Sequence, residues 1–504
     1  MNLLSNPELQ RNYRAALRPG RMAAVAVIVA ALSLSVGYAY YSSNDANIPP
    51  GNWGREFFAL VLWAQLLVLV VGGGFACLLA ISREKEHNTF DFQRVTRLSP
   101  VELAVGKLLG APAPAQFVTI CLMPAAIVGA VVGRMGPDQV LAIFGVFFIS
   151  AIAWHAFAVL ISLLIERNSA ATGGLLYLIL LGLLSNTFGR TLQMLTPFYA
   201  VVMLEQTEWA ANPNLRSYDR RFVDFFFGAP VDHAIVLIVL SLITLAWVLL
   251  ALARNIKRDP AAYELYTPWQ SLGLALTVNL VLVGFFDWES VRFASAHSQL
   301  LMTNLILFFG LGMAVLRNRD RLRRRFNEVG PGASGWLAAF WPGTYLIGGF
   351  AATGLGIIGV ITIVAKGDPG WSPVPPLVAL GLCAMWLARD VLFIQWMYLT
   401  RVKRALMMAV LYLIVFYTCA TVLLGTLGLL KVPAGGASSA IFLPFLGLAL
   451  DDKAWEAHAG LWLLALAMQF PIVTLLAWLQ RQKLQALVAR RALPTSAAAP
   501  AAAD

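Results

Sequence analysis

Charged side chains concentrate in one segment, residues 82–110, of a chain that carries few charges elsewhere. Only 12% of the 504 residues are charged. Hydrophobic stretches flank the segment on both sides, each long enough to cross a bilayer. A polar segment between two membrane spans can meet a soluble partner at the membrane surface. The charged residues in it include Glu84, Lys85, Glu86, Asp91, Arg94, Arg97, Glu102 and Lys107.

Within this segment, Ser99-Pro100-Val101-Glu102 has the form of a capping box. The Ser99 hydroxyl can accept from the backbone N–H of Glu102, and the Glu102 carboxylate can accept from the N–H of Ser99. Pro100 stands at the first helical position, where its missing N–H costs nothing. The sequence therefore predicts a short helix from Pro100 to about residue 109. Its expected apolar stripe is Val101, Val105 and Leu108, with Glu102 and Lys107 displayed elsewhere on the helix.

A second candidate site lies inside a hydrophobic stretch, where Arg389 and Asp390 are adjacent. A charge at the centre of a membrane helix costs about 2.5–3.5 kcal/mol on insertion scales, so each needs a partner or water. Two interpretations stay open. The pair forms part of a substrate path or gate, or Arg389 extends toward the cytoplasm while Asp390 bonds to a neighbouring helix.

Other side-chain chemistries have little support in the sequence. The five histidines are scattered, without the close spacing of a metal site. His155 either relays protons or hydrogen-bonds between helices. There is no cluster of carboxylates or histidine-centred arrangement for catalysis, and no G-x-x-x-x-G-K-[ST] nucleotide-binding motif. We therefore expect no catalytic residue, no metal site and no cofactor bound by this chain.

Membrane helices must position these residues. Hydrophobic residues make up 59% of the chain and the mean hydropathy is +0.72, whereas soluble domains are about 45–50% apolar. The alternation typical of a barrel is missing, so the fold class is all-α. A length of about twenty apolar residues per span predicts about twelve spans. They lie near 22–41, 57–81, 111–133, 138–165, 171–188, 233–253, 270–286, 298–316, 336–364, 375–399, 405–430 and 460–480.

The basic residues indicate the orientation. With a cytoplasmic N-terminus, 26 of the 37 lysines and arginines fall in the inside loops, as the positive-inside rule requires. An even number of spans places the C-terminus in the cytoplasm as well. The net charge of +11 is thus sorted by membrane side, which argues against a nucleic-acid partner. Residues 1–21 are expected to form an amphipathic helix on the inner leaflet, with basic side chains toward anionic headgroups; the alternative is a solvated tail.

The predicted spans fall into two six-helix halves, residues 22–258 and 259–480. A cytoplasmic tail, residues 481–504, follows and is partly disordered because its end is of low complexity. Two outside segments, 189–232 and 431–459, contain apolar pieces too short to span, which suggests re-entrant or interfacial helices. Halves of equal orientation are typical of parallel repeats.

The charged segment resembles the cytoplasmic loop of ABC-2-type transporter permeases. That loop carries an acidic pair, a threonine, a leucine-Ser-Pro turn, a further acid and a glycine-lysine pair before the next span. Asn88 stands where the family usually has glycine, and asparagine tolerates the same left-handed backbone. Phe92 or Val95 stands near the usual leucine. The matching residues are Glu84, Glu86, Thr89, Leu98, Ser99, Pro100, Glu102, Gly106 and Lys107, and the segment includes Asp91 and Arg94.

The resemblance implies the transmembrane permease subunit of an ABC exporter in a bacterial inner membrane. ATP and magnesium would bind to a separate nucleotide-binding ATPase that docks on this loop. The substrate would be lipid-like, hydrophobic or polymeric. The corresponding loop of the second half, residues 317–335, has no acidic pair, so the transmembrane unit is either this chain alone, a homodimer or a pair with a second permease.

Two other function classes stay open. An ion-coupled secondary transporter usually needs several membrane-buried acids, and Asp390 is almost alone. A membrane-embedded lipid or glycosyl transferase would need clustered catalytic groups at one membrane face.

Overall fold

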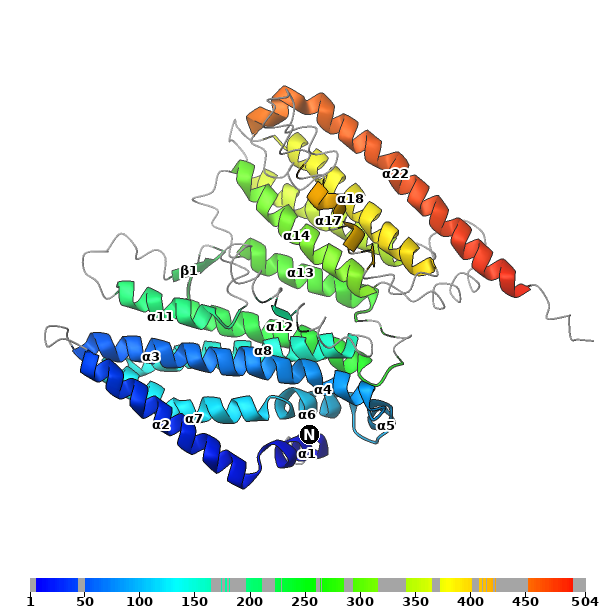
Figure 1. The fold of residues 1–504 in the computed structure, drawn as a ribbon. Coiled ribbons are helices and arrows are strands. Elements are labelled where there is room, and N and C mark those ends of the chain that lie inside the picture. The colour runs from blue at the N-terminus through cyan, green and yellow to red at the C-terminus, as the bar shows by residue number, and fades with distance from the viewer. Residues whose placement is uncertain are drawn as a thin grey trace, which may run out of the picture. The chain divides into compact units, whose positions relative to one another are not determined.

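The structure is a computed structural model of the whole chain. It describes residues 6–43, 50–164, 196–210, 223–227, 229–259, 265–284, 293–315, 341–364, 372–400 and 452–492, together with residue 263 and scattered residues within 174–181 and 408–422. Figure 1 draws these elements as coloured ribbons.

Apart from one hairpin, the regular structure in the described residues is helical. Eight helical stretches are long and apolar enough to cross a membrane, so the protein is an all-α, multi-pass membrane protein. The helices of the N-terminal part are α1 (Pro7–Ala16), α2 (Pro19–Ser43), α3 (Pro50–Leu66), η2 (Leu67–Gly73), α4 (Gly74–Glu86), α5 (Phe90–Arg94), α6 (Pro100–Gly110), α7 (Ala113–Val132), α8 (Pro137–Leu164), α11 (Tyr199–Ala210) and α12 (His233–Asn255). Those that follow are α13 (Pro268–Gly284), α14 (Phe293–Val315), α17 (Trp341–Val364), α18 (Val374–Leu399) and α22 (Asp452–Ala492).

The chain forms two compact units, residues 1–265 and 266–504. In the first unit, α8 packs between α4 and α12, α3 packs on α7, and α1 packs on α6. In the second unit, α18 packs along α22, and α14, α17 and α18 contact one another. Six spans in each unit, and a repeat relation between them, stay predictions.

Several predicted spans are helices with different limits. The last one lies within α22, whose 41 residues extend beyond the predicted span on both sides, to Asp452 and to Ala492. The seventh and eighth appear as α13, with 17 residues, and α14, with 23 residues. The fifth and eleventh lie mostly outside the described residues, as do the loop 317–335, the apolar piece of 431–459 and the last residues, 493–504.

One short apolar piece predicted as a helix forms a hairpin instead. Strands β1 (Val223–Phe226) and β2 (Ala229–Asp232) pair antiparallel, with Val223 opposite Asp232. Valine and phenylalanine favour strands because their side chains pack well on a pleated surface. Phe227, at the turn, has a left-handed φ of 50°. The other apolar piece of the same outside segment contains the start of α11, which is helical as predicted.

The second predicted span is one continuous helix with a π segment, η2, in its middle. Two side chains from elsewhere in the unit reach carbonyls of η2: the Tyr177 hydroxyl donates to Val70 O at 2.8 Å, and His155 Nε2 lies 2.8 Å from Leu69 O. The interhelical hydrogen bond expected of His155 is therefore present. Glycine is needed beside it, because a Cβ at Gly73 would lie 2.8 Å from His155 Nε2.

Candidate functional site

The segment 82–110 begins as the end of α4, which closes in a Schellman motif. The N–H of Thr89 donates to Glu84 O at 2.9 Å, and the N–H of Asn88 donates to Lys85 O at 3.3 Å. This pairing requires a left-handed residue after the helix, and Asn88 supplies it with φ of 58°. The expectation that asparagine can replace the usual glycine here is confirmed.

The capping box at the start of α6 is also confirmed. Ser99 Oγ accepts from the N–H of Glu102 at 3.2 Å, and Glu102 Oε2 accepts from the N–H of Ser99 at 2.8 Å. These hydrogen bonds stabilise the carboxylate, so they lower the pKa of Glu102 below its ordinary value. The helix runs from Pro100 to Gly110, close to the predicted limits.

Lys107 is not displayed to solvent, contrary to the prediction. Only 2% of its side chain is exposed, and its ammonium lies 2.5 Å from Glu84 Oε2 and 3.2 Å from Glu8 Oε1. The face of α6 that carries Lys107 is covered by α1 and lies beside α4. A buried ammonium needs such counter-charges, since its desolvation is otherwise very costly.

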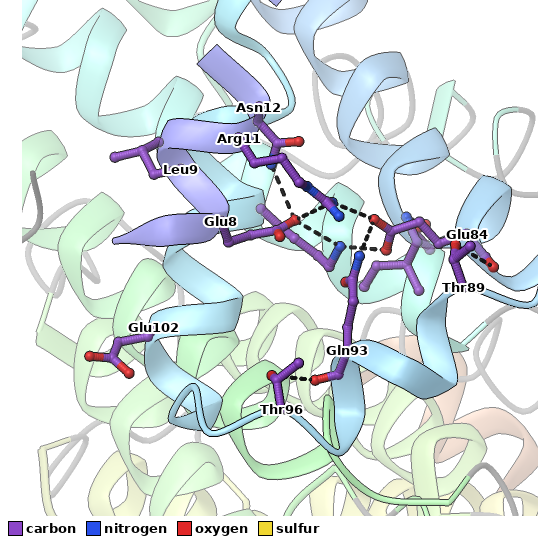
Figure 2. A network of polar contacts seen from close by, with 12 residues as sticks. Glu8, Leu9, Arg11, Asn12, Glu84, Thr89, Gln93, Thr96 and Glu102 are labelled. Carbon is purple, nitrogen blue, oxygen red and sulfur yellow. Dashed lines mark hydrogen bonds and ion pairs between the residues drawn. The ribbon is translucent and has the colours of Figure 1, made fainter. Parts of the chain in front are cut away.

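Further polar contacts extend this pair into a network, shown in Figure 2. Arg11 Nη2 bridges both carboxylates, at 2.8 Å from Glu8 Oε1 and 2.9 Å from Glu84 Oε1. Gln93 Nε2 donates to Glu84 Oε1 at 2.7 Å. The negative charges of Glu8 and Glu84 are balanced by the positive charges of Arg11 and Lys107. The network connects four helices, α1, α4, α5 and α6. We call Glu8, Arg11, Glu84, Gln93 and Lys107 the charge lock.

Gln93 was missed as a site residue, and so were two further members of the charge lock, Glu8 and Arg11. Glu8 and Arg11 come from α1, which docks on α6 instead of remaining a solvated tail. Asn6 caps α1 with its Oδ1, and its Nδ2 donates to Glu102 O at 2.7 Å. The only sequence signals were the Asn-Pro start of α1 and the Gly-x-x-x-Gly spacing of α6, Gly106 and Gly110, which allows two helices to approach closely.

Those two glycines form the contact between α1 and α6. A Cβ at Gly106 would lie 2.8 Å from Glu8 Cβ, and one at Gly110 would lie 2.7 Å from Asn12 Cβ. Both distances are too short for real carbon atoms, so any side chain at these positions moves α1 away. Glycine at these positions is therefore required for the charge lock to form.

Gly106→Ala is expected to lower the free energy of unfolding by about 1–3 kcal/mol, the usual range for an overpacked contact. Hydrogen–deuterium exchange in α1 should become faster as the helix separates from α6. Gly20→Ala is the matched control, because a Cβ at Gly20 meets no atom within 4 Å. Equal thermal midpoints and equal exchange in the two variants would contradict this interpretation.

The outer surface of the segment is apolar in its middle. Phe92 is 73% exposed and Val95 is 83% exposed, and the charged residues Glu86, Asp91 and Arg97 are exposed around them. We call Phe92 and Val95 the tip patch. The predicted apolar stripe of α6 was partly wrong, because Val101 is 49% exposed and the buried face is formed by Leu103, Ala104 and Leu108.

Two lysines tie the segment to other helices of the unit. Lys85 Nζ donates to Leu163 O at 2.5 Å and to Ser162 O at 3.3 Å, where a positive charge suits the last carbonyls of α8. Lys257, just after α12, donates to Thr96 O at 2.7 Å. The segment is thus held from several sides, and its position depends on that of the helices.

The second candidate site is a closed polar cluster in the second unit. Arg389 Nε donates to Asp390 Oδ1 at 3.0 Å, its Nη1 to Gln469 Oε1 at 3.3 Å, and its Nη2 to Tyr417 Oη at 2.9 Å. The Tyr417 hydroxyl in turn donates to Asp390 Oδ2. The guanidinium centre also lies 4.9 Å from the centroid of the Trp386 ring.

The partners of this cluster come from several helical segments. The guanidinium group of Arg389 is buried and donates to Gln469 of α22, so it has polar partners within the protein. Asp390 bonds outside its own helix, to Tyr417, as one interpretation predicted. The polar partners replace the snorkelling that Arg389 would otherwise need.

Comparisons of the chain with known protein families, with curated proteins and with solved structures find no match.

Proposed function

We propose that the protein is the transmembrane permease subunit of an ABC exporter in a bacterial inner membrane, with both termini in the cytoplasm. Residues 82–110 receive movement from a separate nucleotide-binding ATPase, which binds the ATP and magnesium. The observation that carries the proposal is the tip patch: two exposed apolar side chains, Phe92 and Val95, on a segment fixed between two spanning helices.

The arrangement suits the transfer of force. α5 presents the tip patch, and Gln93 on the other side of α5 bonds to the charge lock. Through Glu84 the charge lock continues into α4, and through Lys107 into α6 and then α7. A push on α5 therefore moves helices on both sides of the segment, instead of being absorbed by a flexible loop.

The residues suggested by the resemblance divide into two roles in this proposal. Glu84, Gly106 and Lys107 are turned inward and fix the segment. Glu86 and Asp91 lie on the exposed side, where they can contact basic groups of an ATPase around the apolar patch. Exposed apolar groups surrounded by polar ones are typical of a protein-binding surface.

The proposed substrate is lipid-like, hydrophobic or polymeric, because the spanning helices of the described chain are strongly apolar. A homodimer or a second permease would complete the unit if one chain is insufficient.

The test is co-purification of ATP hydrolysis with the protein from its native membranes. Phe92→Asp with Val95→Asp should reduce the co-purifying ATPase activity at least tenfold, because carboxylates would replace the apolar contact. The control is Phe92→Leu with Val95→Ile, which keeps an apolar surface and should retain the activity. If hydrolysis never co-purifies, or if both pairs behave alike, the proposal fails.

A further inference from the structure

Exposed arginines lie at the end of α1 and at the start of α2. Arg14 is in the last turn of α1, Arg18 is in the two-residue break between the helices, and Arg21 is in the first turn of α2. The three arginines therefore fall within eight consecutive residues, and all are exposed. Within the part of the chain that the structure describes, none of the three forms an ion pair.

The apolar side of α1 is already covered by protein. Leu9 is buried, and the Tyr13 hydroxyl donates to Gln116 Oε1 of α7 at 3.2 Å. Burial also raises the pKa of Tyr13 above its ordinary value. A helix that lies on a bilayer usually inserts its apolar side into the lipid. In α1 this side is used for packing, so only its charged face is left for a contact with the membrane.

The arginines lie where lipid headgroups must be. α2 is a candidate span that begins at Pro19, so Arg18 and Arg21 flank the point at which the chain enters the bilayer. No acidic residue occurs between Glu8 and Asp45 to neutralise them. Guanidinium groups bind phosphate oxygens with paired hydrogen bonds, which suits an anionic headgroup.

We propose that Arg14, Arg18 and Arg21, which surround the junction of α1 and α2, bind anionic phospholipid headgroups. Bound lipid holds α1 at the membrane surface, and α1 in turn covers Gly106 and contributes two members of the charge lock. The inference goes beyond the proposed function and does not depend on it, since it concerns the lipid around the chain and not an ATPase.

The experiment uses the purified full-length protein in detergent, titrated with phosphatidylglycerol or with phosphatidylcholine. A ligand that binds the folded state raises its stability. Phosphatidylglycerol should raise the thermal midpoint of the natural protein more than phosphatidylcholine does, and added salt should reduce the difference. The variant Arg14→Gln, Arg18→Gln, Arg21→Gln should lose most of the difference, whereas the control Arg83→Gln, Arg97→Gln, two exposed arginines of residues 82–110, should keep it.

An unchanged preference for phosphatidylglycerol in the triple variant would overturn the proposal. It would also be overturned if the triple variant kept this preference but lost a co-purifying ATPase, because the arginines would then face a protein. Should the variant not fold, the natural protein in nanodiscs gives the answer. Amide exchange in α1 should be slower with phosphatidylglycerol than with phosphatidylcholine, and equal exchange would contradict the inference.

Discussion

Lys107→Met is expected to lower the free energy of unfolding by about 3–5 kcal/mol, the usual cost of removing one partner from a buried ion pair. The Lys107 ammonium lies between Glu8 and Glu84, and the Glu8 side chain is only 5% exposed. In the variant that lacks the Lys107 ammonium, Arg11 alone must balance the negative charges of both carboxylates. About half of the Arg11 side chain faces solvent. The first contacts to weaken should be those between α1 and α6.

The thermal midpoint in detergent and amide exchange in α1 measure this effect. Lys257→Met is the matched control, since Lys257 makes an exposed hydrogen bond to a single carbonyl. Adding Glu8→Gln and Glu84→Gln to Lys107→Met should recover part of the loss, because no unbalanced buried carboxylate then remains. If Lys107→Met and Lys257→Met had equal thermal midpoints, the Lys107 ion pairs of the charge lock would contribute nothing to the stability of the protein.

Arg389→Met should destabilise the second unit by a similar amount, about 3–5 kcal/mol. It leaves the buried Asp390 carboxylate with the Tyr417 hydroxyl as its remaining partner in the cluster, and it removes the link to Gln469 of α22. Arg389→Lys should rescue little, because an ammonium cannot reproduce the planar fork that reaches three partners.

The informative comparison is the pair Arg389→Met with Asp390→Leu. If the cluster serves packing, this pair should be more stable than Arg389→Met alone, since no buried charge is left without a partner. Thermal midpoints of the three variants decide the question. A double variant as unstable as the single one would show that the interaction with Tyr417 and Gln469 is itself required.

Local features of the candidate site could be predicted because their partners are adjacent in sequence. The capping box joins Ser99 to Glu102, and the left-handed Asn88 follows directly from the end of α4. The position of Lys107 could not be predicted in the same way. Its partner Glu8 lies 99 residues earlier, and nothing in the charge pattern shows that α1 docks on the glycines of α6.

The hydrophobic length criterion found the eight long apolar helices of the described residues, but not the limits of these helices or the exceptions to the pattern. It treats Val223–Phe226 only as a short apolar run, although a run rich in Val and Phe that is followed by Gly and Pro is typical of a hairpin. It also cannot detect the π segment, because three successive glycines beginning at Gly72 only lower the mean hydropathy of the helix slightly. Hydropathy reports which residues prefer lipid, not how the backbone is hydrogen-bonded.

The π segment has a consequence for the direction in which the tip patch points. A widened turn accommodates a surplus residue compared with an α-helix, and each residue advances an α-helix by about 100°. Deleting one residue within Leu67–Gly73 would therefore let the widened turn close to an α-helical turn and leave the direction of α4 nearly unchanged. A deletion in α4 between Gly74 and Glu84 meets no such slack and would rotate Glu84 by roughly 100° away from Lys107, so the two halves of this one span tolerate a change of length very differently.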